Sequence, residues 1–278
     1  MKRQWIVDKQ ESGLTIGEFA CLHQINRKAL KDIKMRGDIL VDNEHQTVRY
    51  VLKAGEVVTF ISPSEDRQIT GENMPLTIVY EDDWLLIVDK EKGMPCIPTR
   101  HYQSGTLAHA LSYYYEQIHL DSTIHLVNRL DRQTAGLMMI AKYREIHDIM
   151  SKQVDHIYRR YQANVEGELI GKGTIRLPIY RENKAMRRVI DERGKPSCTH
   201  YRSIEVKGNQ SLVEFVLETG RTHQIRVHMA AVHHPLIGDE LYGNASDDFD
   251  LTSIMVAFIH PVTKQIITIR KKKGQQQR

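Results

Sequence analysis

The sequence predicts an α+β protein, with a mixed, mainly antiparallel sheet and flanking helices in a larger domain, and a small N-terminal α/β module before it. Short apolar and alternating segments typical of strands dominate the larger part. Two of them, Thr199–Val206 and Ser211–Glu218, fit a hairpin closed by a turn at Gly208-Asn209. The polar stretch Ser62–Met74, which contains proline and glycine, separates this part from the first sixty or so residues and is typical of a linker.

The expected domain organisation follows from these shifts in composition. We expect a module at 1–62, a linker at 63–75, a larger domain at 76–270 and a disordered, basic and Gln-rich tail at 271–278. In the module, helical spacing of apolar residues predicts a helix near Ile16–Leu22 and another over Arg27–Met35. Strands are expected there at Ile39–Val41, Val48–Leu52 and Glu56–Phe60.

The elements of the larger domain are expected in a definite order. The strand Tyr158–Gly167 alternates strongly and places Tyr161, Ala163 and Val165 on one face. The other expected elements are strands at Leu76–Tyr80, Trp84–Asp89, Ile124–Leu130, Leu137–Ala141, Ile254–Ile259 and Gln265–Ile269, and helices at Thr106–Tyr115, Tyr143–Lys152 and from Arg221 or Thr222 to about Val232.

Composition excludes several classes of protein. The chain has 278 residues, of which 41% are hydrophobic and 27% are charged, as in ordinary globular proteins. No apolar run approaches the roughly 20 residues that cross a bilayer, and the N-terminus lacks a signal-peptide pattern. Its three cysteines, Cys21, Cys96 and Cys198, lie far apart, so neither a disulfide framework nor a zinc site is expected. A reducing, cytoplasmic location and no membrane partner are the expectation.

The second predicted helix of the N-terminal module is strongly basic. Two interpretations of this pattern stay open: a solvated helix face, or a surface that binds the phosphates of a polyanion. The net charge of +4 permits a polyanionic partner without requiring one. The basic residues are Arg27, Lys28, Lys31, Lys34 and Arg36.

A polar cluster lies between two apolar segments in the middle of the chain. Arg129 and Arg132 bracket Asp131, and nearby guanidinium groups are expected to keep this carboxylate ionised. An aspartate beside arginines is most often a structural ion pair, so the cluster alone does not establish a catalytic site.

A second polar cluster, Thr219–His228, opens a predicted helix. Arg221 and Arg226 could bind a polyanion or a buried carboxylate, or they could belong to a solvated helix face. A metal site is not expected, because no His-Glu-x-x-His pattern or carboxylate triad accompanies the histidines of this region. These histidines are His223, His228, His233 and His234.

Read together, the clusters resemble the motifs of the RluA-type RNA pseudouridine synthases. The family signature His-Arg-Leu-Asp-Arg-x-Thr-Ser-Gly-Leu is similar to residues 128–137, and Gly-Arg-Thr-His-Gln-Ile-Arg-x-His is present unchanged at Gly220–His228. Further matches are the Tyr161 strand ending in Val165-Glu166-Gly167, the segment His233–Gly243, and Asp89–Gly93. Residues 14–60 are similar to the S-four-like RNA-binding module often fused to these synthases. The resemblance extends from Leu14 to about Ile269.

Three positions depart from the family motifs: Asn128 replaces the usual His, Ala135 the usual Ser, and Glu91 the usual Pro. None of them removes the aspartate, the arginines or the tyrosine. We interpret them as marks of a divergent subgroup, and they bear on the substrate more than on the reaction.

The resemblance implies an isomerase that converts uridine to pseudouridine in structured ribosomal or transfer RNA, acting as a monomer without a metal or other cofactor. It implies that Asp131 is the essential carboxylate, paired with Arg221 or, as the weaker candidate, Arg226. Tyr161 would stack on the uracil and help to remove the proton at carbon 5. Arg129 would fill the space that the flipped uridine leaves, and the basic helix would bind RNA phosphates.

Two other hypotheses stay open. One is an RNA chaperone or ribosome assembly factor of the same fold without catalysis, against which the intact Asp131, Tyr161 and Arg221 argue. The other is a glycoside hydrolase, which requires a second carboxylate near Asp131.

Overall fold

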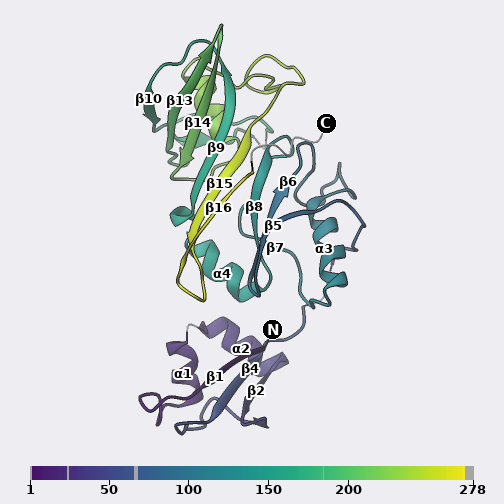
Figure 1. Cartoon of the computed structure of the whole chain (residues 1–278), viewed down its shortest axis with the longest axis vertical. Coiled ribbons are helices and arrows are strands. Elements are labelled where there is room, and N and C mark those ends of the chain that lie inside the picture. The colour runs from purple at the N-terminus through teal and green to yellow at the C-terminus, as the bar shows by residue number, and fades with distance from the viewer. Residues whose placement is uncertain (1, 24, 66–67, 184, 273–278) are drawn as a thin grey trace. The chain divides into compact units, whose positions relative to one another are not determined.

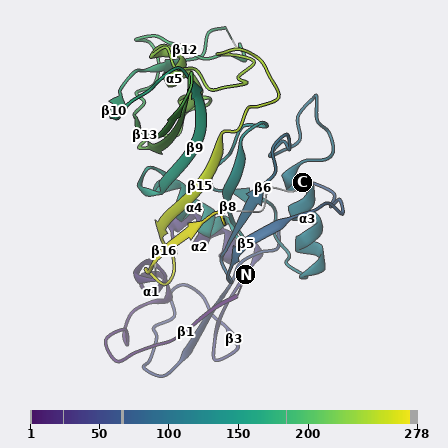
Figure 2. The ribbon, with the colours of Figure 1, turned by 45° about the horizontal axis from the view of Figure 1, so that its top comes forward.

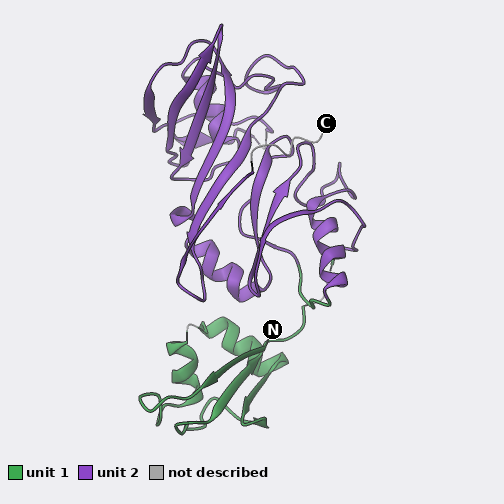
Figure 3. Cartoon of the chain, viewed as in Figure 1, with its two compact units in different colours: residues 1–68, 119–123 green, residues 69–118, 124–278 purple. Residues whose placement is uncertain are grey.

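The chain divides into two compact units. The computed structural model describes residues 2–23, 25–65, 68–183 and 185–272. Unit 1 comprises residues 1–68 and 119–123, and unit 2 comprises residues 69–118 and 124–278 (Figure 3). The boundary at 68/69 falls inside the predicted linker, and most of the predicted tail lies outside the described residues. Within the described part, no helix is long and apolar enough to cross a membrane.

Unit 1 packs two helices on a four-stranded antiparallel sheet. Helix α1 (Ile16–Leu22) begins with a capping box between Thr15 and Glu18, and Asn26 caps α2 (Arg27–Arg36). The strand order is β1-β4-β2-β3, with β1 Lys2–Ile6, β2 Asp38–Val41, β3 Glu44–His45 and β4 Val57–Ile61. The core of this unit includes Phe19, Ile33 and Phe60.

Three features of unit 1 differ from the expectation. Strand β3, only two residues long, was not expected. Strand β1 was not expected, because its two apolar residues, Trp5 and Ile6, are adjacent and show no alternation in the sequence. The expected strand at Val48–Leu52 is wrong: Tyr50 N–H donates to the Thr47 carbonyl in a turn, and Val51 makes only an isolated bridge to Thr15. The apolar residues there pack on the core without forming a ladder.

Unit 2 is built on a ten-stranded sheet (Figure 1). Eight of its strands follow the order β10-β13-β14-β9-β15-β8-β6-β5, and the other two, β16 and β7, pair with β15 and β8. Every pair is antiparallel except β15 with β8, so the predicted mixed, mainly antiparallel sheet is confirmed. The strands are β5 Thr77–Glu81, β6 Leu85–Lys90, β7 His125–Leu126, β8 Ala135–Ala141, β9 Tyr158–Glu166, β10 Lys172–Ile175, β13 Thr199–Lys207, β14 Gln210–Leu217, β15 Thr252–Ile259 and β16 Ile266–Arg270. A separate ribbon pairs β11 (Ile179–Tyr180) with β12 (Val189–Ile190).

The helices of unit 2 flank this sheet. Helix α4 (Arg144–Lys152) packs on β7 and β8 through Ile146 and Met150. Helix α3 (Leu107–Gln117) lies beside β5 and β6 in Figure 1, and a short 3₁₀ turn (Val154–His156) leads into β9. Helix α5 (Gln224–Ala231) lies next to β12 and β13, as Figure 2 shows.

The sequence placed most of these elements but misjudged two segments beside the polar clusters. The expected strand Ile124–Leu130 is only β7, because the chain leaves the sheet after Leu126. Helix α5 begins at Gln224, later than expected, because His223 has a left-handed φ of 58° that interrupts a helix. Strands β10, β11 and β12 are short and were not expected.

Candidate active site

One residue at the centre of the sheet brings the loop that carries Asp131 close to β9, which carries Tyr161. This aspartate loop comprises residues 127–134, between β7 and β8. Ser253 of β15 is the register partner of Gly136 in β8 and also of Tyr161 in β9. Gly136 has φ +104°, and a Cβ there would lie 2.2 Å from the Ser253 carbonyl oxygen. Only glycine fits this approach. The start of β8, where this loop ends, is therefore separated from Tyr161 by the single strand β15.

The aspartate loop is fixed by backbone contacts on both sides of Asp131. Asn128 Oδ1 accepts from Met139 N–H at 2.8 Å, so the side chain that replaces the usual His holds the loop to β8. The buried Cys96 thiol donates to the Leu130 carbonyl at 3.0 Å. Thr134 N–H donates to the Asp131 carbonyl at 3.0 Å. These three hydrogen bonds fix the main chain of the loop, and the main chain in turn positions Asp131.

The side chain of Asp131 is 29% exposed and faces α5. Its Oδ2 lies 3.9 Å from Arg226 Nη1 and 3.8 Å from His223 Nε2. Arg226 is buried, and its Nε and Nη2 donate to the two oxygens of Asp239 at 2.7 and 2.6 Å. The rings of Tyr242 and Phe249 lie 5.2 and 5.3 Å from its guanidinium carbon. Asp239 and two aromatic rings therefore hold the guanidinium that faces Asp131.

His223 is a neutral neighbour of Asp131. Burial lowers its pKa below the ordinary 6.5, although the charge of Asp131 acts in the opposite direction. Its Nδ1 lies 3.0 Å from the hydroxyl of Tyr242, which orients the ring. Of these two neighbours on α5 and its N-terminus, Arg226 consequently carries the positive charge at neutral pH.

Tyr161 is buried in β9, opposite Phe215 in β14. Burial raises the pKa of its hydroxyl, which the charge of Asp131 raises further and that of Arg159 lowers. The side chain is therefore a neutral phenol at neutral pH. Arg159, two residues earlier, is also buried, and within the described part its Nε and Nη2 have no hydrogen-bond partner. Unsatisfied buried donors of this kind call for a polar ligand.

The other expected site residues lie elsewhere. Arg221 donates from Nε to the Pro196 carbonyl at 3.2 Å, so Arg226, the weaker candidate, is the arginine placed against Asp131. Neither of the two arginines adjacent in sequence forms an ion pair with Asp131 in the described part of the chain: Arg129 is exposed, and Arg132 lies over the ring of Tyr102 at 5.6 Å. The ion pair of Asp131 thus comes from a distant helix.

Sequence reasoning missed Lys90, a fully buried lysine at the end of β6. Its Nζ donates to the carbonyls of Glu91, Met94 and Arg132 at 2.9, 2.8 and 3.1 Å. Burial lowers its pKa to about 8, while the charge of Asp131 favours the ammonium form. The available signal was a lysine ending the otherwise apolar strand Leu85–Val88.

A cavity of about 420 Å³ opens beside Arg226, the arginine that faces Asp131. Arg226 and Phe249 line it together with Gln133 of the aspartate loop and Lys92. Its volume is within the range of small-molecule sites, large enough for one nucleotide base.

The basic residues of α2 form a separate surface in unit 1. All five are exposed on the helix: Arg27, Lys28, Lys31, Lys34 and Arg36. Of these, Arg36 lies 3.8 Å from Asp32 in an exposed ion pair. The helix therefore offers several cations to solvent.

The mainly antiparallel mixed sheet and the partly exposed aspartate facing a buried arginine agree with the class of RNA pseudouridine synthases. Residues 84–231 match the family of RNA pseudouridylate synthases, and the chain belongs to that family. It is an isomerase that converts uridine to pseudouridine in RNA.

Relatives and solved structures agree with this assignment. The chain is 37% identical to the "Uncharacterized RNA pseudouridine synthase YjbO" of Bacillus subtilis, covering 91% of this chain and 93% of that protein. It is 36% identical to the "Ribosomal large subunit pseudouridine synthase D" of Haemophilus influenzae, covering 77% and 72%. Human RNA Pseudouridylate Synthase Domain Containing 1 shares the fold, with a TM-score of 0.60 at 23% identity over 73% of this chain and 85% of that one.

Proposed function

We propose that this isomerase acts on uridines of ribosomal RNA, with Asp131 as its essential carboxylate. The placement of Asp131, partly exposed and 3.9 Å from the buried Arg226, carries the proposal. The curated relatives named for the large ribosomal subunit, including those of Haemophilus influenzae and Vibrio cholerae, support the choice of RNA.

The geometry suits a reaction that cuts the bond between the base and the sugar and rejoins them through carbon 5. A carboxylate that attacks the sugar or the base must be ionised and reachable. Arg226 supplies the positive field, and because Asp239 holds this arginine in a fixed orientation, the field needs no rearrangement as charge develops.

Tyr161 supplies a ring and a hydroxyl to the same site. Because the pKa of Tyr161 is raised, its hydroxyl is protonated when the uracil binds. The hydroxyl can therefore accept the proton of carbon 5 only if it passes its own proton to another group. Arg159, with two unsatisfied donors, would hold an oxygen of the target nucleotide. Arg129, exposed beside the loop, would enter the RNA where the uridine has left its stack.

The two rival hypotheses have weaker support. A glycoside hydrolase needs an accessible acid near the nucleophile. The carboxylate placed near Asp131, Asp239, is fully buried and accepts hydrogen bonds from Arg226 and from two backbone amides. A non-catalytic assembly factor does not need a partly exposed aspartate that faces a buried arginine.

Unit 1 would bind RNA through α2. Its exposed cations bind phosphates without reading sequence, so each should add to the salt dependence of binding. Replacing Lys28 and Lys31 by Gln should reduce the salt slope by about one for each phosphate that the variant no longer binds. Lys9→Gln, an exposed lysine of the same unit outside α2, is the control. Equal slopes in all variants would refute this role.

The choice of RNA is tested by mapping pseudouridines in a strain that lacks the protein. Loss of pseudouridine at one or more ribosomal positions is expected, with return on expression of the wild type and not of Asp131→Asn. An unchanged ribosomal map with losses confined to transfer RNA would contradict the proposed substrate and leave the isomerase assignment intact.

A further inference from the structure

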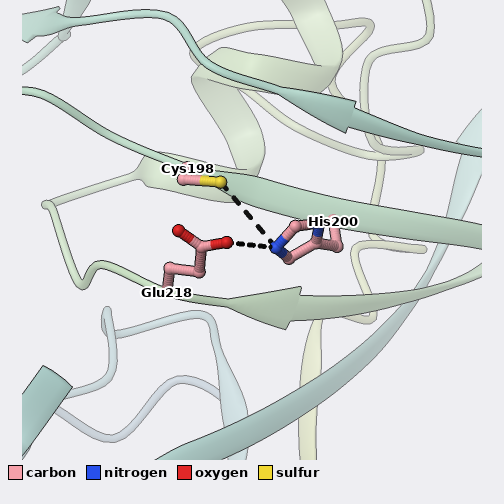
Figure 4. A group of neighbouring side chains, drawn as sticks. All are labelled: Cys198, His200 and Glu218. Atoms are coloured by element: carbon pink, nitrogen blue, oxygen red, sulfur yellow. Dashed lines mark hydrogen bonds and ion pairs between the residues drawn. The ribbon is translucent and has the colours of Figure 1, made fainter. Parts of the chain in front are cut away.

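Three side chains outside the active site converge at the end of the β13–β14 hairpin. Cys198 lies just before β13, His200 lies in β13, and Glu218 directly follows β14 (Figure 4). His200 Nε2 lies 3.8 Å from Cys198 Sγ and 2.6 Å from Glu218 Oε1. The three ligand atoms all lie within 4.8 Å of one another. Cys198 is buried, His200 half-buried and Glu218 exposed, so the cluster opens to solvent on one side.

The arrangement is unlike that of a nucleophilic triad. In a triad the thiol and the carboxylate approach different nitrogens of the imidazole, so that one activates and the other orients. Here both approach the same atom, Nε2 of His200, as Figure 4 shows. The three donor atoms are therefore grouped around one another and do not form a relay from carboxylate through imidazole to thiol. Such a group of ligand atoms is typical of a metal site.

The other ring nitrogen is engaged in the manner of a metal-binding histidine. Nδ1 of His200 lies 2.8 Å from the hydroxyl of Thr174 in the neighbouring strand β10. Because Nε2 lies 2.6 Å from a carboxylate oxygen, it carries a proton in the metal-free protein. When a metal replaces that proton, Nδ1–H can donate to the Thr174 hydroxyl and so orient the ring with its Nε2 lone pair on the ion. Arg176 Nη2 lies 3.5 Å from Glu218 Oε1 and opposes a cation, but the Arg176 side chain is 65% exposed and can turn into solvent.

We propose that Cys198, His200 and Glu218 bind a transition-metal ion of the zinc class. One thiolate, one imidazole and one carboxylate form a mixed donor set that zinc accepts, whereas magnesium and calcium prefer oxygen alone. On binding, the sulfur–metal bond replaces the S–H bond and the thiol proton passes to solvent. The metal also replaces the Nε2 proton of His200, which moves to Nδ1, and the Nε2–H bond to Glu218 is exchanged for two bonds to the ion. The fourth position of the ion is open to water.

The site connects to the helix that carries Arg226. Thr219, next to Glu218, accepts from Cys198 N–H through its hydroxyl at 3.0 Å. Gln224, the first residue of α5, donates to the Cys198 carbonyl at 2.9 Å and accepts from Arg221 N–H. A bound ion would therefore brace the loop from which α5 starts.

The test is cobalt and zinc binding to the reduced, metal-free full-length chain. Cys21→Ser serves as the parent, since it removes the exposed thiol of unit 1. The parent should bind one equivalent of Co²⁺ with a near-ultraviolet thiolate-to-cobalt band, which Zn²⁺ displaces. Adding Cys198→Ser should abolish the band, and His200→Gln should weaken Zn²⁺ binding by at least about 100-fold. Cys96→Ser, which removes a buried thiol elsewhere, should leave both unchanged.

Glu218→Gln guards against a folding artefact, because Glu218 is exposed and this change preserves its shape. It should weaken Zn²⁺ binding by at least about 10-fold with an unchanged melting temperature in the absence of metal. Three results would each overturn the proposal: no thiolate band at micromolar cobalt, a band that survives Cys198→Ser, or unaltered zinc affinity in Glu218→Gln.

Discussion

Arg226 is shared between two aspartates. Its Nε and Nη2 form a two-pronged pair with the fully buried Asp239, and its remaining Nη1 lies 3.9 Å from the partly exposed Asp131. Asp239 orients the guanidinium, and the positive charge of the guanidinium acts on Asp131. One carboxylate therefore positions Arg226, and the other is the group that Arg226 stabilises.

Asp239→Asn should therefore lower both stability and activity. It leaves a buried guanidinium without its countercharge, and breaking a buried pair costs about 3–5 kcal/mol. Urea unfolding and single-turnover isomerisation measure the two effects. Arg202→Gln, which breaks the exposed pair with Glu214, is the control and should cost less than about 1 kcal/mol. Similar losses in both variants would mean that the Asp239 pair contributes no more than a surface pair.

Gly136→Ala should disrupt the central register. Gly171 has a similar φ of +87° and no atom within 4 Å of a built Cβ, so Gly171→Ala isolates backbone strain. We expect a cost of about 1–3 kcal/mol for Gly171→Ala, and a clearly larger one for Gly136→Ala, whose methyl group meets the Ser253 main chain. Activity should fall only in Gly136→Ala. Equal stability losses would show that the crowding against Ser253 relaxes without cost.

The buried Lys90 makes stability depend on pH. Its pKa falls from 10.5 in the unfolded chain to about 8 in the folded one. Between pH 8 and pH 10.5 the unfolded chain binds more protons at Lys90 than the folded chain does. The free energy of unfolding therefore increases as the pH rises through this window and decreases as the pH falls through it. The stability of wild type relative to Lys90→Met should increase by roughly 1 kcal/mol per pH unit in this window. A flat difference in urea unfolding would show that Lys90 titrates normally.

Tyr161→Phe should separate stacking from proton transfer. Phe keeps the ring and loses the hydroxyl, so turnover of uridine should slow by roughly 10²–10⁴ if the hydroxyl takes part in removing the carbon 5 proton. A 5-fluorouridine substrate, which has no such proton, should still yield a rearranged product. Near-wild-type rates on uridine would exclude the proton-transfer role, and loss of the fluorinated product would place Tyr161 at an earlier step.

Local patterns in the sequence were enough to place Tyr161 and the hairpin of β13 and β14. Strand alternation fixes which side chains are buried together, and Gly208-Asn209 fixes the turn. Unit 1 was recognisable because its two helices carry their own caps and apolar faces. These features depend on neighbours within a few residues.

The partner of Asp131 could not be read in the same way. Arg129 and Arg132 are adjacent to it in sequence, yet the arginine that lies 3.9 Å from Asp131 is Arg226, which comes from the distant helix α5. The cluster of Cys198, His200 and Glu218 has the same origin, since pairing of two strands joins residues about twenty apart. Long-range pairing sets both, and no local motif encodes it.

The measurement closest to the central claim is single-turnover isomerisation of ribosomal RNA by Asp131→Asn, alongside RNA affinity and thermal unfolding. The loop is held by main-chain contacts and by Asn128, so the fold and RNA affinity should stay near wild type. Isomerisation should be abolished, because the neutral amide cannot serve as the ionised carboxylate beside Arg226. Retention of more than a small fraction of the wild-type rate would contradict the account.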